Sequence, residues 1–189
     1  MTTSAASLIY RLDNSFWRFS IAIYQNECVK KSCLAFQENH QINVNLLLLC
    51  CWLAYSVEEI SKSDLLNACR SVENWHTNVT QPLRATRKWL KSLNAVDPWT
   101  DDFYQLTLMD EIASETYQQH CLFSYFENRQ KTPDLNNEAL AITYLHWLFN
   151  DFGDQTDIDS ALKTDIGHFV RLVFSMVATH EKITPNHRD

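Results

Sequence analysis

The sequence predicts an all-α protein, a single-domain bundle of about seven helices around a central buried helix at about residues 44–57. The 189-residue chain has only 2 glycines and 4 prolines, so the tight turns that join β-strands are poorly provided for. An unbroken apolar run extends from Leu46 to Tyr55, and a helix that is apolar all round has to be surrounded. Ten residues rise about 15 Å against a bilayer core of about 30 Å. Protein is therefore the expected surround, and no membrane insertion is expected.

Length and cysteine usage predict one domain in a reducing compartment. A chain of 189 residues can bury a substantial core without disulfides or metals. We assign residues 1–180 to this domain and expect residues 181–189 to fray. No Cys-x-x-Cys pair is present, and the first residues lack the pattern of a signal peptide. These features predict a cytoplasmic protein in which the adjacent Cys50 and Cys51 are core residues and not a redox pair.

Residues that favour helix caps separate the first three helices. Asp13 or Asn14 can cap a dense apolar helix that ends near Gln25. Residues 27–39 have apolar positions at spacings of three and four, which predicts an amphipathic helix. Asn43 then stands before the buried helix as its expected cap.

A long helical region is predicted to open at Ser63 or Asp64 and to extend to about Asn94. Pro82 lies inside it, and proline removes an amide donor and crowds the preceding turn. Either the helix kinks near Asn78 or a new helix begins there. We favour a kinked, nearly continuous helix, because this proline is the only helix-breaking residue in the region.

Three further helices are expected in the acidic second half. The first follows the break at residues 97–99, has Thr100 as its expected cap and ends near Asn128. Its predicted inward residues are Leu106, Met109, Ile112, Ala113, Thr116 and Tyr117. The last two helices, at about residues 135–152 and 157–179, have wide apolar faces and are separated by Gly153.

Charge is distributed unevenly along the chain. The net charge is −7, with six basic against two acidic side chains in residues 61–94 and six against sixteen in residues 95–189. An acidic protein without a recognised nucleic-acid motif is an improbable nucleic-acid binder. The basic segment can still receive an acidic group. Four of its cations share one helical face and form the first candidate site, for a partner or an anion: Arg84, Arg87, Lys88 and Lys91. The competing interpretation is a solvated face, neutralised by the acidic half of the same chain.

A metal or small-molecule site is the second candidate. Helical di-metal sites combine Glu-x-x-His elements with carboxylates from other helices. The matching residues here are Glu73, His76, Glu111 and Glu115. Six tryptophans could alternatively line an apolar pocket, although plain aromatic packing is the explanation we favour. No cofactor is predicted, and the motifs of hydrolases and nucleotide-binding folds are absent.

Three segments carry a family resemblance: residues 13–20 (DNSFWRFS), 43–54 (NVNLLLLCCWLA) and 81–87 (QPLRATR). In their order and residue identities they resemble an uncharacterised gammaproteobacterial family of small helical proteins, domain of unknown function 2390. The likeness covers about the first 95 residues. It implies a cytoplasmic bacterial protein and carries no catalytic residues with it.

Two hypotheses for function follow from these residues. The first is a non-enzymatic cytoplasmic helical protein that contacts another protein, or a second copy of itself, through the basic face and nearby exposed aromatic residues. The alternative is a helical small-molecule or metal-binding protein, possibly an enzyme, whose pocket is lined by aromatic, carboxylate and histidine side chains. The two differ in whether these polar side chains converge in a buried pocket, so enzymatic activity stays undecided at this stage.

Overall fold

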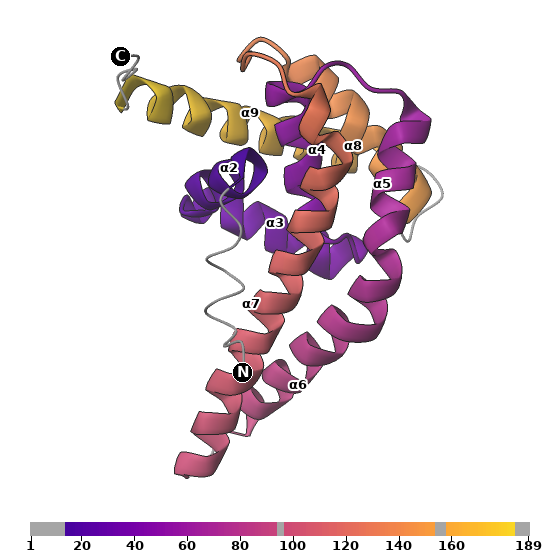
Figure 1. Cartoon of the computed structure of the whole chain (residues 1–189). Coiled ribbons are helices and arrows are strands. Elements are labelled where there is room, and N and C mark those ends of the chain that lie inside the picture. Colours follow the sequence, from indigo (N-terminus) through magenta and orange to yellow (C-terminus); the bar gives the residue numbers. More distant parts are fainter. Residues whose placement is uncertain (1–13, 94–96, 154–157, 184–189) are drawn as a thin grey trace, which may run out of the picture.

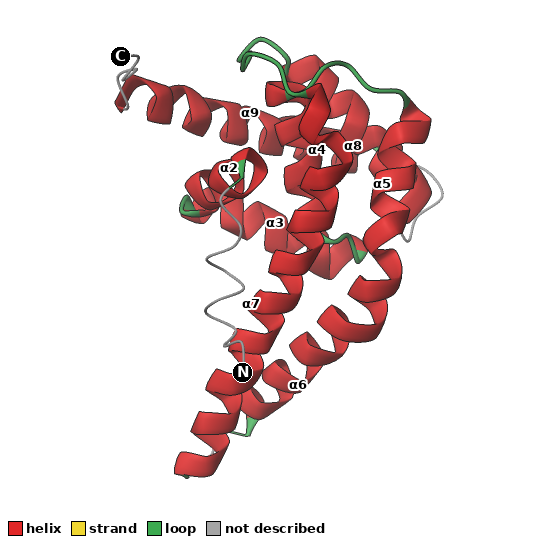
Figure 2. Cartoon of the chain, in the orientation of Figure 1, coloured by secondary structure: helices red, strands yellow, loops and turns green. Residues whose placement is uncertain are grey.

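The computed structural model describes residues 14–93, 97–153 and 158–183 as a bundle of helices from which one helix pair projects (Figure 1). Helices and loops account for this part of the chain (Figure 2), with one isolated β-bridge between Val57 and Gln130. The elements are α2 (Ser15–Tyr24), α3 (Glu27–His40), α4 (Val44–Ser56), α5 (Lys62–Trp75), the π-helix η1 (His76–Thr80), α6 (Gln81–Ser92), α7 (Pro98–Phe126), the 3-10 helix η2 (Glu127–Arg129), α8 (Glu138–Phe152) and α9 (Ser160–Ile183). The predicted all-α bundle is confirmed.

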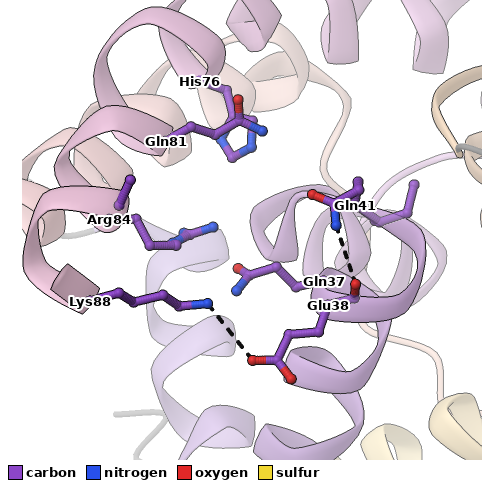
Figure 3. Close-up of a pocket in the computed structure, with 9 residues that line it drawn as sticks. Gln37, Glu38, Gln41, His76, Gln81, Arg84 and Lys88 are labelled. Carbon is purple, nitrogen blue, oxygen red and sulfur yellow. Dashed lines mark hydrogen bonds and ion pairs between the residues drawn. The ribbon is translucent and has the colours of Figure 1, made fainter. Parts of the chain in front are cut away.

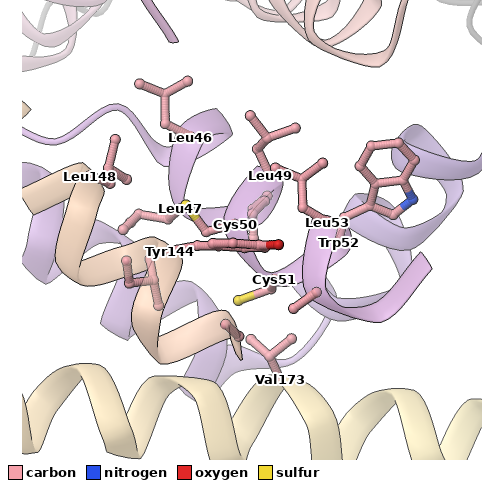
Figure 4. Packing of buried hydrophobic residues seen from close by; sticks show 14 of the residues in the cluster. Leu46, Leu47, Leu49, Cys50, Cys51, Trp52, Leu53, Tyr144, Leu148 and Val173 are labelled. Atoms are coloured by element: carbon pink, nitrogen blue, oxygen red, sulfur yellow. The ribbon is translucent and has the colours of Figure 1, made fainter. Parts of the chain in front are cut away.

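Helix α4 is the hub of the core. All its residues from Asn45 to Ser56 are buried, and α8, α2, α3 and α7 all contact it. Figure 4 shows the α4 side chains packed against Tyr144 and Leu148 of α8, with Val173 of α9 beyond them. Because α4 has protein on every side, its sequence needs no polar face. The predicted central helix is confirmed.

Buried thiols contribute to this core. Cys50 and Cys51 are fully buried, and desolvation raises the pKa of both thiols well above the usual range. Desolvation likewise raises the pKa of Cys33 and Cys69 to about 12. All six cysteines are free. The buried ones therefore behave as small apolar side chains, as expected for Cys50 and Cys51.

Side-chain caps explain where the helices begin. Asn14 and Asn43 cap α2 and α4 as expected, each accepting a backbone N–H within the first turn. Helix α5 begins slightly earlier than expected, because Ser61 and Asp64 form a reciprocal capping box. Helix α7 also begins earlier, since Asp97 accepts the amide of Thr100 at 3.0 Å and occupies the cap position expected of that threonine.

The expected kink is confirmed and takes the form of a π-helical turn. Helix α5 passes directly through η1 into α6, and the amide of Gln81 bonds the carbonyl of His76. Pro82 falls in the first turn of α6, where an α-helical partner for its missing amide is not required. The wider turn thus lets the chain stay helical through a proline and change direction. With α5, η1 and α6 as one segment, the described residues form the expected seven helical segments.

Helices α8 and α9 complete the bundle against α4 and α2. Helix α8 ends at Gly153 as predicted. Helix α9 continues to Ile183, so residues 181–183 of the expected frayed tail are helical, and residues 184–189 lie outside the described residues. None of the helices in the described ranges combines the length and apolar character that a membrane span requires.

Candidate functional site

Helix α6 and the first half of α7 run antiparallel and extend away from the bundle (Figure 1). We call this part, residues 81–93 and 97–112, the projecting hairpin. It contains all four cations of the predicted basic face and Glu111 of the predicted metal set. Its two helices pack against each other, so each has one face toward its partner and the remainder toward solvent or the bundle.

An Arg–Glu cluster joins the two helices. Arg84 donates from Nε to Oε1 of Glu111 at 3.0 Å and from Nη2 to Oε1 of Glu115. Arg87 donates from Nε to Oε2 of Glu111 and from Nη2 to Oε1 at 3.2 Å. The side chains of Arg84 and Glu111 are only 13% and 6% exposed. Two of the four predicted cations are therefore paired inside the protein with carboxylates of its acidic half, as the competing interpretation expected, but on a buried face instead of a solvated one.

The pKa values of the two carboxylates in this cluster shift in opposite directions. Burial alone would raise the pKa of Glu111, but the hydrogen bonds from Arg87 and Arg84 outweigh it and hold the pKa below its usual value. Burial dominates at Glu115 and raises its pKa, although Arg84 acts in the opposite direction. The two arginines therefore favour the charged form of Glu111 more strongly than that of Glu115.

Lys88 and Lys91, the other two predicted cations, lie at the surface. The Nζ of Lys88 is 3.8 Å from Oε1 of Glu38 on α3, and both side chains are more than half exposed. Lys91 is exposed in the last turn of α6. The structure thus divides the predicted basic face into two internal arginines and two surface lysines.

The four residues of the predicted metal site do not form one. Glu73 is exposed on α5, His76 is buried in η1, and the other two are held by arginines. Within the described ranges no three His, Cys, Asp or Glu side chains are placed to hold a metal ion. The described tryptophans differ widely in burial: Trp52 is fully buried, whereas Trp89 and Trp99 are 60% and 85% exposed.

From Thr107 to Gln119 the inward face of α7 is polar, contrary to the prediction. Leu106, Met109 and Tyr117, predicted to lie inside, are 62%, 37% and 46% exposed. Ile112 and Ala113 are half-buried. The buried positions of α7 are Thr107, Glu111, Ser114, Thr116, Gln118, Gln119, Leu122 and Phe126, of which only Thr116 was predicted. The prediction was wrong because it assumed that an apolar stripe always turns inward. Here the arginines of α6 select the polar face.

Helix geometry places several exposed apolar residues toward one side of the projecting hairpin. Several stand one position before a residue that faces the partner helix, which rotates them by about 100° from the contact. These pairs are Trp89–Leu90, Phe103–Tyr104 and Leu106–Thr107, where Leu90 and Thr107 are buried and Tyr104 bonds Arg87. In an antiparallel pair, positions rotated in this sense fall on the same side of both helices. We define the apolar flank as Trp89, Leu93, Trp99, Phe103 and Leu106, all of them exposed.

Comparison with known families covers both the hairpin and the hub. The family model described as "Protein of unknown function (DUF2390)" matches residues 15–122, more than half of the chain. The protein belongs to this family. The match confirms the resemblance and extends it beyond residue 95, through most of α7. No curated protein and no solved structure matches the chain. In this DUF2390 protein the matched segment includes the Arg–Glu cluster, whereas α8 and α9, which cover the hub, lie after it.

A buried polar seam in the DUF2390 segment positions the hairpin on the bundle. Asn43 donates to Oε1 of Gln118 at 2.6 Å, and Gln118 donates onward to Oγ1 of Thr80 at 2.6 Å. Ser114 donates to the same hydroxyl at 3.1 Å. The seam thus joins α4, η1 and α7 through directional bonds in a low-dielectric interior. The sequence signalled Asn43 only as a cap, because the partner glutamine is distant along the chain.

His76 predicts a pH dependence of stability in this DUF2390 protein. Burial first, and Arg84 second, lower its pKa from 6.5 to about 4. Between these values the unfolded chain takes up the proton more readily than the folded one. The unfolding free energy should therefore fall as pH decreases from about 6.5 to about 4. Urea denaturation at pH 7 and pH 5 measures the slope, and His76→Gln should flatten it. An equal slope in both proteins would contradict the assignment.

Proposed function

We propose that the protein acts by binding another protein in the cytoplasm, and that it does so through the apolar flank of the projecting hairpin. The observation that carries the proposal is the inverted amphipathic character of the N-terminal part of α7, where Thr107 and Glu111 are buried. On the same part of the helix, Trp99, Phe103 and Leu106 are 85%, 55% and 62% exposed. Scattered exposed apolar residues need no explanation, but a contiguous group of large ones is typical of a binding surface. The free state of all six cysteines fits a reducing compartment.

Aromatic side chains give this flank the composition of an interface. Trp89, Trp99 and Phe103 are large and rigid, and such residues dominate the binding energy at protein interfaces. The packed Arg–Glu cluster beneath them holds the two helices together, so the surface exists before the partner arrives. A preformed surface loses little conformational entropy on binding.

The charges beside the flank indicate the chemistry of the partner. Helix α7 contains no lysine or arginine, and its exposed charges along the hairpin are Asp101, Asp102 and Asp110. Apolar surface bordered by carboxylates is complementary to an amphipathic helix whose apolar face is bordered by Lys or Arg. We therefore assign the occupant as a cationic amphipathic helix of another protein. A second copy of this chain is a poorer fit, because its carboxylates would face the same carboxylates and repel them.

Two designed peptides test the assignment on the full chain. Both are amphipathic helices with one apolar face, bordered by Lys in the first and by Glu in the second, and binding is measured by calorimetry and tryptophan fluorescence. The Lys peptide should bind and the Glu peptide should not. Phe103→Asp should weaken binding by about 2 kcal/mol, roughly thirtyfold in Kd. Tyr125→Asp is the matched control, because Tyr125 is also exposed, at 45%, but lies at the far end of α7.

The other outcomes decide against the proposal. Equal binding of both peptides would contradict the proposed charge complementarity. An equal loss of affinity in the two variants would show that the apolar flank is not the binding surface. Sedimentation of the wild type is measured in parallel. A dimer that Phe103→Asp converts into a monomer would show that the occupant is a second copy and would overturn the assignment of another protein.

A further inference from the structure

A polar cavity lies where the bent segment α5–η1–α6 faces the C-terminal end of α3. Its volume is about 510 Å³, within the range of small-molecule sites. It is lined by Gln37, Glu38, Gln41, Ile42, His76, Gln81, Arg84, Ala85 and Lys88. Figure 3 shows the α6 cations on one side, the α3 residues opposite, and His76 with Gln81 at one end. The cavity is separate from the apolar flank, because Lys88 and Trp89 point from different sides of α6.

The ring of His76 lines the end of this cavity and has a buried polar atom without a partner among the described residues. Its side chain lines the cavity and the residue is only 9% exposed, yet Nδ1 has no hydrogen-bond partner among the described residues. Buried polar atoms are satisfied in most proteins, and each exception calls for a reason. Burial and Arg84 lower the pKa of this imidazole to about 4, so it is neutral near pH 7. A neutral ring offers a donor or an acceptor to a ligand without adding charge.

Two cations reach the cavity from α6. Arg84 uses Nε and Nη2 for the carboxylates of α7, and its side chain also lines the cavity. Lys88 is paired with Glu38 only loosely, at 3.8 Å, and these side chains are 55% and 63% exposed. An exposed pair of this kind contributes little to stability. Lys88 can therefore turn from Glu38 to a ligand at small cost.

Gln41 places an amide in the cavity from a strained backbone position. Its φ of 55° is in the left-handed region, and it is the one non-glycine residue of the described chain with positive φ. Glycine is the usual residue at the position that follows a helix, since a side chain there costs free energy. The chain keeps a glutamine whose Nε2 donates to the carbonyl of Glu38 at 3.2 Å. Strain retained at a cavity wall is typical of functional sites.

The polarity of the cavity sets the orientation of a ligand. Cations stand on the α6 side, while α3 presents its C-terminal end, where helix carbonyls carry partial negative charge. An anionic group therefore belongs next to Arg84 and Lys88. Groups that donate hydrogen bonds belong next to the end of α3 and the amides of Gln37 and Gln41.

We propose that this cavity binds a small hydroxylated organic anion, with its phosphate or carboxylate between Arg84 and Lys88 and its hydroxyls toward Gln37, Gln41 and His76. Phosphate and carboxylate share the recognition by Arg and Lys. The hydroxyl groups distinguish the ligand from inorganic anions. This inference is independent of the protein-binding proposal, since no residue of the apolar flank lines the cavity.

The test uses the full chain and four probes: glucose 6-phosphate, gluconate, glucose and inorganic phosphate. Calorimetry gives the affinity, and NMR of the His76 ring reports whether the ligand occupies the cavity. Either or both organic anions should bind with a Kd below about 1 mM and shift the His76 signals. The stronger of the two identifies phosphate or carboxylate as the anionic group. Glucose and inorganic phosphate should bind at least about tenfold more weakly.

Matched variants separate the cavity from general charge effects. Lys88→Gln should weaken binding about tenfold, whereas Lys91→Gln, which makes the same charge change one turn of α6 away outside the cavity, should not. Gln41→Gly removes an amide while relieving the backbone, so it should fold at least as stably as the wild type and still weaken binding. The proposal is overturned if neither organic anion binds, if glucose binds equally well, or if the two lysine variants lose the same affinity.

Discussion

Replacing Glu111 by glutamine is expected to lower the unfolding free energy by about 3 kcal/mol. The side chain of Glu111 is 6% exposed and accepts hydrogen bonds from both Arg84 and Arg87. Glutamine has nearly the same shape but no charge, so Arg87 would be left partly buried beside a neutral amide. A cation that is removed from water without a counter-charge is costly, and the loss falls on the contact between α6 and α7.

Urea denaturation followed by circular dichroism measures this loss. Glu73→Gln is the matched control, because Glu73 is exposed on α5, and it should change the free energy by less than about 0.5 kcal/mol. Arg87→Met combined with Glu111→Leu should recover most of the loss, since a well-packed apolar pair replaces a buried ion pair at little cost. Similar small effects of Glu111→Gln and Glu73→Gln would show that the cluster does not hold the hairpin together.

Truncating the central tryptophan should have an effect of similar or larger size. Trp52→Ala is expected to destabilise the protein by about 3 to 5 kcal/mol. Trp52 is fully buried, and its ring centroid lies 5.2 Å from that of Phe16 and 5.9 Å from that of Phe123. Alanine would leave a cavity at the contact between α4, α2 and α7, and the surrounding helices can close it only in part.

The same substitution at an exposed tryptophan is the control. Trp99 is 85% exposed, so Trp99→Ala should change the unfolding free energy by less than about 0.5 kcal/mol. Trp52→Phe should cost less than Trp52→Ala, because the indole N–H of Trp52 has no partner among the described residues and a phenyl ring keeps much of the packing. Equal losses for Trp52→Ala and Trp99→Ala would contradict the hub assigned to α4.

The sequence pattern predicted burial correctly for the helix that is apolar on every side. Leu46 to Tyr55 is apolar on every side, so burial was the only arrangement open to it, and Asn43 was the obvious cap. Pro82 likewise predicted the bend, although the sequence could not show that the bend takes the form of a π-helical turn. At these positions the local sequence and the tertiary packing favour the same conformation.

Helix α7 shows where the same reasoning fails. Its pattern has an apolar stripe through Leu106 and a polar stripe through Glu111, and either could turn inward. The choice was made by Arg84 and Arg87 on another helix, which need buried carboxylates opposite them. Because Arg84 and Arg87 are paired with these carboxylates, only two of the four predicted cations remain at the surface.

The sequence by itself determined the helical class, the buried hub, most of the helix boundaries and the family. These depend on turn residues, caps and runs of apolar side chains, which act over a few positions. Only the tertiary structure decided which face of α7 is exposed, and only it brought His76, Arg84 and Gln41 around one cavity. The physical reason is that periodicity records the two faces of a helix, whereas the side chains packed opposite decide which of them is buried.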